Sequence, residues 1–131
     1  MAPQTDRPLS PFLTYRWTLT MAMSLIHRAT GIALYGGTLL MAWGLIATAS
    51  SPAAYACFEA FATSWIGRIA IFGFTWSLMH HALSGLRYLV WDTGHGYAPG
   101  PREGMTRGAL IGGVLATIAV WAIACYFGAG R

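Results

Sequence analysis

The stretch "ATGIALYGGTLLMAWGLIA", residues 29–47, decides the fold class of this chain because it runs its whole length without a charged residue. A bilayer core of about 30 Å requires roughly 20 apolar residues in a helix. Two more stretches share this character, "IAIFGFTWSLMHHALSGL" at residues 69–86 and "GALIGGVLATIAVWAIACYF" at residues 108–127. The sequence therefore predicts three membrane-spanning helices.

The overall composition supports an all-α membrane protein. The chain has 131 residues, enough for one small domain, and 56% of them are hydrophobic. Only 9% are charged, against about 25% in a typical soluble domain, and the mean hydropathy is +0.52. The net charge of +4 lacks the basic patch with interleaved aromatic residues that a nucleic acid would need, so no nucleic-acid partner is expected.

The arginines predict the orientation, since the chain contains no lysine. Arg7 and Arg16 precede the first apolar stretch, Arg102 and Arg107 lie between the second and third, and the first connection has no arginine. The positive-inside rule then places the amino terminus inside and the carboxyl terminus outside. The expected segments are an inner amino-terminal segment 1–18, spanning helices 19–47, 65–91 and 107–128, an outer loop 48–64 and an inner loop 92–106.

The first 18 residues also bear on localisation. They lack the apolar core of a secretory signal and the long arginine- and serine-rich stretch of an organellar presequence. We expect a multi-pass protein of the bacterial inner (cytoplasmic) membrane, with the mitochondrial inner membrane as the alternative.

The candidate functional residues are the polar ones inside the apolar stretches. Ser24, His27 and Arg28 recur along one face of the first helix, and His81 lies on the second. Ionisable residues within a membrane are functional by default, and a neutral imidazole is a common ligand of haem iron. Gly85, one turn after His81, leaves room for a flat macrocycle. From the residues alone, a haem site and a set of polar helix–helix contacts both remain open.

Other residues receive structural interpretations. Arg68 and Arg87 are expected to anchor the second helix at the headgroups, with Asp92 as a partner of Arg87. Cys57 in the outer loop and Cys125 near the outer end of the third helix are expected to be free thiols without a catalytic role. A disulfide between them is the alternative.

Small residues four apart predict close helix packing. Gly108, Gly112 and Ala116 form such a row in the third helix, and Ala33 with Gly37 forms one in the first.

Two motifs carry a resemblance to a known family. The first is "RPLSPFLTYRWTLTMAMSLIHRATG", residues 7–31, and the second is "HALSGLRYLVWDTGHG", residues 81–96. In this order they resemble the signatures of the cytochrome b556 subunit of succinate dehydrogenase, the larger membrane anchor of respiratory complex II. Together the motifs cover about a third of the chain.

The resemblance implies a role for each residue. His81 matches an axial ligand of haem b, whose other axial histidine comes from the smaller membrane anchor subunit. Ser24 and Arg28 match residues that line the ubiquinone site, and His27 and Arg28 match contacts to the haem propionates. Ubiquinone would be reduced near the inner surface by electrons from the iron–sulfur subunit, which receives them from a flavoprotein subunit that oxidises succinate. With four acidic residues and no nucleotide-binding glycine pattern, this chain is expected to hold no dicarboxylate active site.

Some positions depart from the family pattern. Tyr88 and Phe12 stand where members often have histidine, and His80 is an alternative to His81 as the haem ligand. We favour His81 because it precedes Gly85 by four residues, whereas His80 points about 100° away around the helix. The alternative functions are a fumarate reductase-type anchor that uses menaquinone and a non-redox membrane assembly protein.

Overall fold

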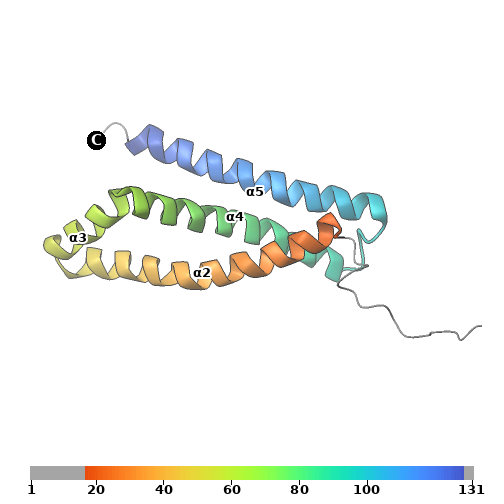
Figure 1. The fold of residues 1–131 in the computed structure, drawn as a ribbon, viewed down its shortest axis with the longest axis horizontal. Helices are drawn as coiled ribbons and strands as arrows, with labels where there is room; N and C mark the ends of the chain where they lie inside the picture. The colour runs from red at the N-terminus through yellow and green to blue at the C-terminus, as the bar shows by residue number, and fades with distance from the viewer. Residues whose placement is uncertain (1–16, 129–131) are drawn as a thin grey trace, which may run out of the picture.

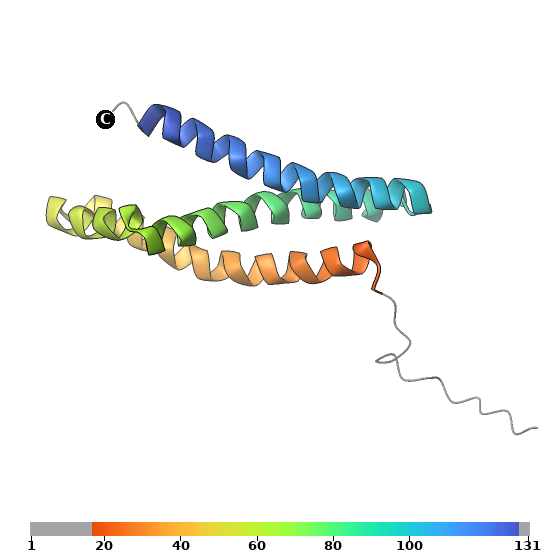
Figure 2. The ribbon, with the colours of Figure 1, turned by 45° about the horizontal axis from the view of Figure 1, so that its top comes forward.

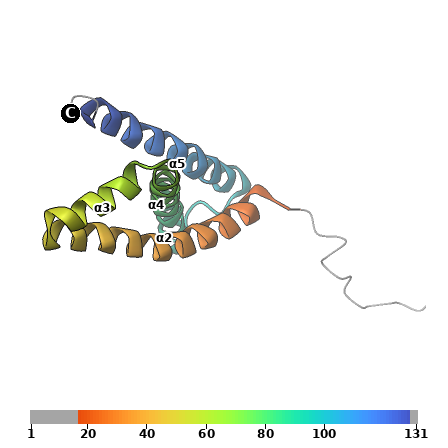
Figure 3. The ribbon, with the colours of Figure 1, turned by 60° about the vertical axis from the view of Figure 1, so that its left-hand side comes forward.

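The computed structural model describes residues 17–128, which form four helices. These are α2 (Leu19–Ser50), α3 (Pro52–Thr63), α4 (Trp65–Asp92) and α5 (Pro99–Gly128). The three long helices run side by side, with α4 between α2 and α5 (Figures 1 and 2). The view along α4 shows α2 and α5 on its two sides, and α3 linking α2 to α4 at one end (Figure 3).

The distribution of polar residues is inverted relative to a soluble protein. The fully buried positions between the helices are mostly polar: Thr30, Ser77, His80, Ser84, Arg87, Thr106 and Thr117. Large apolar side chains such as Ile32, Leu39 and Phe127 are more than 70% exposed. An apolar outer surface around a polar interior is what a bilayer requires, because lipid solvates apolar groups and leaves polar groups to find partners inside the protein.

The expected all-helical fold is confirmed within the described residues. Two of the helices, α2 with 32 residues and α5 with 30, are long and apolar enough to cross a membrane. α4 has 28 residues and is therefore about 42 Å long, which exceeds the bilayer core. α4 is less apolar than the other two and is not one of the two helices that meet this criterion, because it carries two histidines and the buried polar residues Ser77, Ser84 and Arg87.

The segment expected as an outer loop, 48–64, is largely helical, which corrects that expectation. Ser51 caps α3 by accepting a hydrogen bond from the Ala54 amide at 3.1 Å, and Pro52 follows as the first helical residue. Serine at the N-cap and proline at the first position are helix-start signals as well as turn signals. Cys57 therefore lies on α3, and both it and Cys125 are free and exposed.

The sharp turn from α3 to α4 depends on two residues. Ser64 ends α3 and caps α4, its hydroxyl accepting a hydrogen bond from the Gly67 amide at 3.1 Å. A side chain at Gly67 would collide with the carbonyl of Phe61. Glycine is therefore required where the two helices meet.

The connection between α4 and α5 is also shorter than the expected inner loop 92–106. α5 begins at Pro99, so only six residues, 93–98, lie outside helices. Gly94 and Gly96 adopt φ angles of +80° and +81°, which only glycine takes up without strain. Proline is tolerated at the start of α5 because first-turn amides lack helical partners in any case.

Close packing between α4 and α5 centres on Gly113. A Cβ atom at this position would lie 3.1 Å from the Cα atom of His80, whereas one at Gly108 would meet nothing within 4 Å. Gly112, from the predicted small-residue row, lies against the Leu83 side chain, and Gly37 of the other predicted pair lies against the Phe74 ring. The prediction of close packing holds at Gly112 and Gly37, but it missed Gly113.

We expect Gly113→Ala to destabilise the protein and Gly108→Ala to leave it unchanged or more stable. Alanine improves helix propensity by about 1 kcal/mol at both sites, but at Gly113 its methyl group would force α5 away from the α4 backbone, at a cost of about 1–3 kcal/mol. The check is the thermal melting of the two variants, purified in detergent within their native assembly. Equal melting temperatures would contradict the close approach at Gly113.

Candidate functional site

A pair of stacked histidines lies between α2 and α4. The His27 and His81 rings are 4.0 Å apart between centroids, with an interplanar angle of 14°. Gly31, one turn beyond His27, makes space for the second ring, since a Cβ atom there would lie 3.2 Å from His81 Cε1. The structure thus brings together His27 and His81, which the sequence places 54 residues apart.

The hydrogen bonds of His81 select one tautomer. Its Nδ1 lies 3.2 Å from the carbonyl oxygen of His27, which can only accept, so Nδ1 carries the proton. The Thr30 hydroxyl, 3.3 Å from the same Nδ1, donates to that carbonyl oxygen at 2.9 Å. Nε2 is left with a lone pair and forms no hydrogen bond with residues 17–128. A histidine held through Nδ1–H with a free Nε2 is the usual arrangement of a metal-ligating imidazole.

His80, the alternative ligand, has a different environment. It is fully buried, with Nε2 3.3 Å from the Ser84 hydroxyl and its ring 5.4 Å from that of Trp76. Its backbone lies against Gly113 of α5. Both faces of this residue are thus occupied by the helix bundle, whereas His81 is only half-buried.

The surroundings of His81 fit an axial ligand of haem. A Cβ atom at Gly85, one turn further along α4, would meet no atom within 4 Å, so this face of the helix is open beside the imidazole. Tyr88, the next residue along this face of α4, has its ring 5.1 Å from that of His27. Tyr88 therefore lies on the histidine face of α4, although a histidine is what the family resemblance leads us to expect at this position.

Ser24 and Arg28 line a separate cleft on α2. The cleft has a volume of about 310 Å³ and is completed by Trp17, Met21 and Leu25. Ser24 is half-buried and Arg28 is exposed. The single polar stripe expected on this helix thus divides into two adjoining faces: His27 packs against α4, while Ser24 and Arg28 face outward.

Arg87 contradicts its expected role as a headgroup anchor paired with Asp92. It is 3% exposed, and its Nη1 donates a hydrogen bond of 3.0 Å to the Thr106 hydroxyl of α5. Asp92 is exposed and forms no ion pair within residues 17–128. The reason is geometric: Arg87 lies on the side of α4 that faces α5, so its side chain enters the helix interface instead of reaching outward.

Three contributors to the site were missed in the sequence. Thr30, which orients His81, follows His27 by three residues, and this spacing was a usable signal. Gly31 ends the first motif, but its role in admitting the His81 ring depends on how the helices pack. Trp17 precedes the apolar stretch and carries no signal of its own there, although it borders the cleft of Ser24 and Arg28.

The fold and this site define a class: a helical membrane protein with two stacked imidazoles between two of its helices and a polar cleft near the amino-terminal end of the first. The chain belongs to the succinate dehydrogenase/fumarate reductase transmembrane subunit family, whose model matches residues 3–122. This confirms the family resemblance of the two motifs.

Individual relatives agree with the family model. The chain is 45% identical over 92 residues to the succinate dehydrogenase cytochrome b556 subunit of Paracoccus denitrificans, covering 70% of this chain and 71% of that protein. It is 42% identical over 97 residues to the mitochondrial cytochrome b560 subunit of Sus scrofa, covering 70% of this chain and 56% of that protein. The b556 subunit of Rickettsia prowazekii is 32% identical over 93 residues.

Proposed function

We propose that this chain is the larger membrane anchor of a succinate:quinone oxidoreductase, in which it holds haem b and forms part of a ubiquinone-reduction site. The observation that carries the proposal is the hydrogen bonding of His81, in which Nδ1 lies 3.2 Å from the His27 carbonyl oxygen and Nε2 is left available. His80 also has an unpartnered ring nitrogen, Nδ1, but it is buried inside the bundle, whereas His81 is half-buried beside the open face at Gly85.

His81 is the proposed axial ligand, and the smaller anchor subunit supplies the second histidine. When bound, haem b supplies a one-electron store between the iron–sulfur subunit and the quinone. Thr30 and the His27 carbonyl fix the orientation of the His81 ring, because both lie within hydrogen-bond distance of its Nδ1. His27, whose Nε2 is buried without a partner among the described residues, and Arg28 are the proposed contacts of the haem propionates.

Ser24 and Arg28 are the proposed quinone-binding residues. A hydroxyl and a guanidinium both donate hydrogen bonds, as the carbonyl oxygens of a quinone require. The cleft that they line opens on the outside of the chain, so its remaining walls are assigned to the iron–sulfur subunit and the smaller anchor. The flavoprotein subunit, which oxidises succinate, delivers electrons through the iron–sulfur subunit.

A tag on this chain tests the assembly. After mild detergent extraction, the tagged chain should co-purify with a flavin-containing subunit, an iron–sulfur subunit and a smaller membrane subunit. Purification of the chain without flavin or iron–sulfur clusters would contradict the proposed role and favour a non-redox assembly protein.

The proposed topology has three spans, 19–47, 65–91 and 107–128, with the amino terminus inside, in a bacterial cytoplasmic membrane. α4 is assigned as a span because it lies along the lengths of α2 and α5 (Figure 2) and is long enough to cross. Its polar residues are buried against those neighbours instead of facing lipid.

A thiol-labelling experiment tests this orientation. In a Cys125→Ser background, Cys57, which is exposed on α3, should react with a membrane-impermeant maleimide added to intact spheroplasts. In a Cys57→Ser, Cys125→Ser background, His95→Cys in the α4–α5 turn should react only after the membrane is permeabilised. Labelling in the opposite order would reverse the orientation, and labelling of both from one side would remove α4 as a span.

A further inference from the structure

The inference starts from Arg87, a buried cation near the inner end of α4. Its guanidinium donates one hydrogen bond, to Thr106 at 3.0 Å, while Nε and Nη2 are buried and have no partner among residues 17–128. Arginine is charged at every accessible pH, and a buried charge without a counter-ion is strongly unfavourable. These two nitrogens therefore indicate a missing acceptor.

A second buried donor lies beside Arg87. The Arg87 Cζ atom is 4.8 Å from the ring of Trp91, whose Nε1 is buried and likewise has no partner in this part of the chain. The Tyr88 ring lies 4.9 Å from the same Cζ atom. The aromatic rings flank the guanidinium and partly stabilise its charge, but they accept no hydrogen bond from Nε or Nη2.

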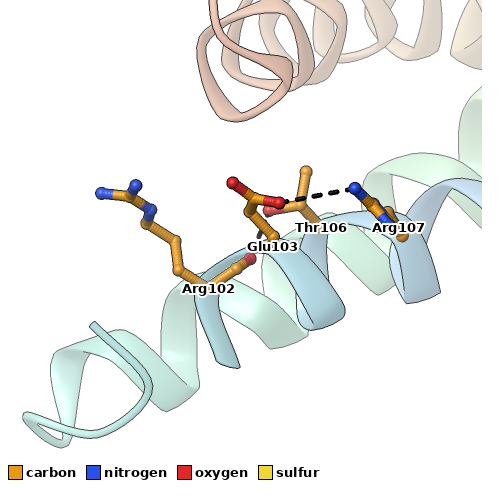
Figure 4. A network of polar contacts seen from close by, with 4 residues as sticks. All are labelled: Arg102, Glu103, Thr106 and Arg107. Carbon is orange, nitrogen blue, oxygen red and sulfur yellow. Dashed lines mark hydrogen bonds and ion pairs between the residues drawn. The ribbon is translucent and has the colours of Figure 1, made fainter. Parts of the chain in front are cut away.

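The acidic residues described near this end of the bundle do not supply the acceptor. Glu103 forms an exposed ion pair of 3.4 Å with Arg107, one turn along α5 (Figure 4). Asp92 is exposed and unpaired within the described residues. Arg102, whose side chain extends away from Glu103 in Figure 4, has a buried Nε without a partner there too. The inner end thus has more arginine donors than acidic acceptors.

This group adjoins the histidine site, because the Tyr88 ring lies 5.1 Å from that of His27, but the hydrogen bonds of the two groups are separate. The hydrogen bond of Arg87 goes to α5, whereas those of His81 go to α2. A guanidinium with two free nitrogens matches a carboxylate, which can accept two parallel hydrogen bonds in a low-dielectric site. We propose that Arg87 and Trp91 form a binding site for one carboxylate, presented by an adjoining protein subunit at the inner end of α4 and α5.

The proposal relies on the proposed function only for the presence of an adjoining subunit. If Arg87 has no carboxylate partner, the co-purification of the redox subunits and the haem spectrum are unaffected, so the two proposals fail independently.

The test compares Arg87→Met with Arg87→Lys in the full complex. Methionine removes the charge and would leave the carboxylate buried and unpaired, so we expect a lower melting temperature and faster subunit dissociation. Lysine keeps the charge but cannot donate two parallel hydrogen bonds to one carboxylate, so we expect a smaller decrease in melting temperature. Arg68→Met is the matched control, because Arg68 is an exposed arginine at the opposite end of α4, and it should melt as the parent does.

Two outcomes would overturn the proposal. If Arg87 is unpaired, Arg87→Met will be as stable as the parent or more so, because a costly buried charge has been removed. If only packing matters, Arg87→Lys will be as harmful as Arg87→Met. If Arg87→Met does not assemble, the amount of complex in the membrane replaces melting as the readout, with Arg87→Lys expected to accumulate more.

Two further variants identify the source of the carboxylate. Asp6 is the one acidic residue of the sequence that lies outside residues 17–128. Asp6→Asn should leave stability unchanged, and a loss equal to that of Arg87→Met would assign the carboxylate to this chain. In a complex from which haem is absent, as the spectrum of a His81→Gln background must first show, the difference between Arg87→Met and Arg87→Lys should persist. Its disappearance when haem is lost would assign the carboxylate to haem and overturn the subunit assignment.

Discussion

Replacement of Arg28 by leucine is expected to lower succinate:quinone reduction by about tenfold or more, while succinate oxidation with a soluble acceptor changes little. Losing a hydrogen bond from a charged donor costs about 1.5–3 kcal/mol, and each 1.36 kcal/mol corresponds to about tenfold in rate. Arg28 lines the cleft with Ser24 and is exposed, so its loss should not disturb the helix bundle. The measurement is the ratio of the two activities in purified complex.

Two control variants show whether the loss of activity in Arg28→Leu comes from the cleft. Ser24→Ala removes a neutral donor from the same cleft and should cause a smaller decrease, of about three- to tenfold. Arg68→Leu removes an exposed arginine at the opposite end of the bundle and should change neither activity. Equal loss of both activities in Arg28→Leu would indicate failed assembly and contradict a direct role in quinone binding.

The second large effect is expected from His81. His81→Gln should remove the b-type haem absorption or convert it to a visibly different spectrum, because an amide is a poor iron ligand. His80→Gln, the matched substitution one residue away, should retain the parent spectrum, since His80 Nε2 lies against Ser84 inside the bundle.

A changed haem spectrum in His81→Gln supports the assignment of His81 as well as complete loss does, because another group can replace a missing axial ligand. The assignment is wrong if His80→Gln alters the spectrum and His81→Gln does not.

The sequence predicted the features that depend on local pattern. Uncharged apolar runs are sufficient to locate α2 and α5, because hydropathy and length act over a single helix. The helical period is sufficient to separate His80 from His81, since adjacent residues point about 100° apart. The structure places His80 fully inside the bundle and His81 on the α2 side, as that argument requires.

The features that depend on packing between helices could not be read in this way. The expected pairing of Arg87 with Asp92 assumed that a charge near a helix end turns outward, whereas the neighbouring α5 receives Arg87 at Thr106. The stacking of His27 on His81 requires the relative rotation of two helices, which the sequence does not specify. α3 was missed because Ser51 and Pro52 signal both a turn and a helix start.

The most direct test of the central claim is an optical difference spectrum of the complex purified through a tag on this chain, with succinate as the reductant. We predict that succinate reduces a b-type haem in this material, and that His81→Gln removes or changes the signal while His80→Gln preserves it. A purified complex that contains no haem, or whose haem succinate does not reduce, would contradict the account.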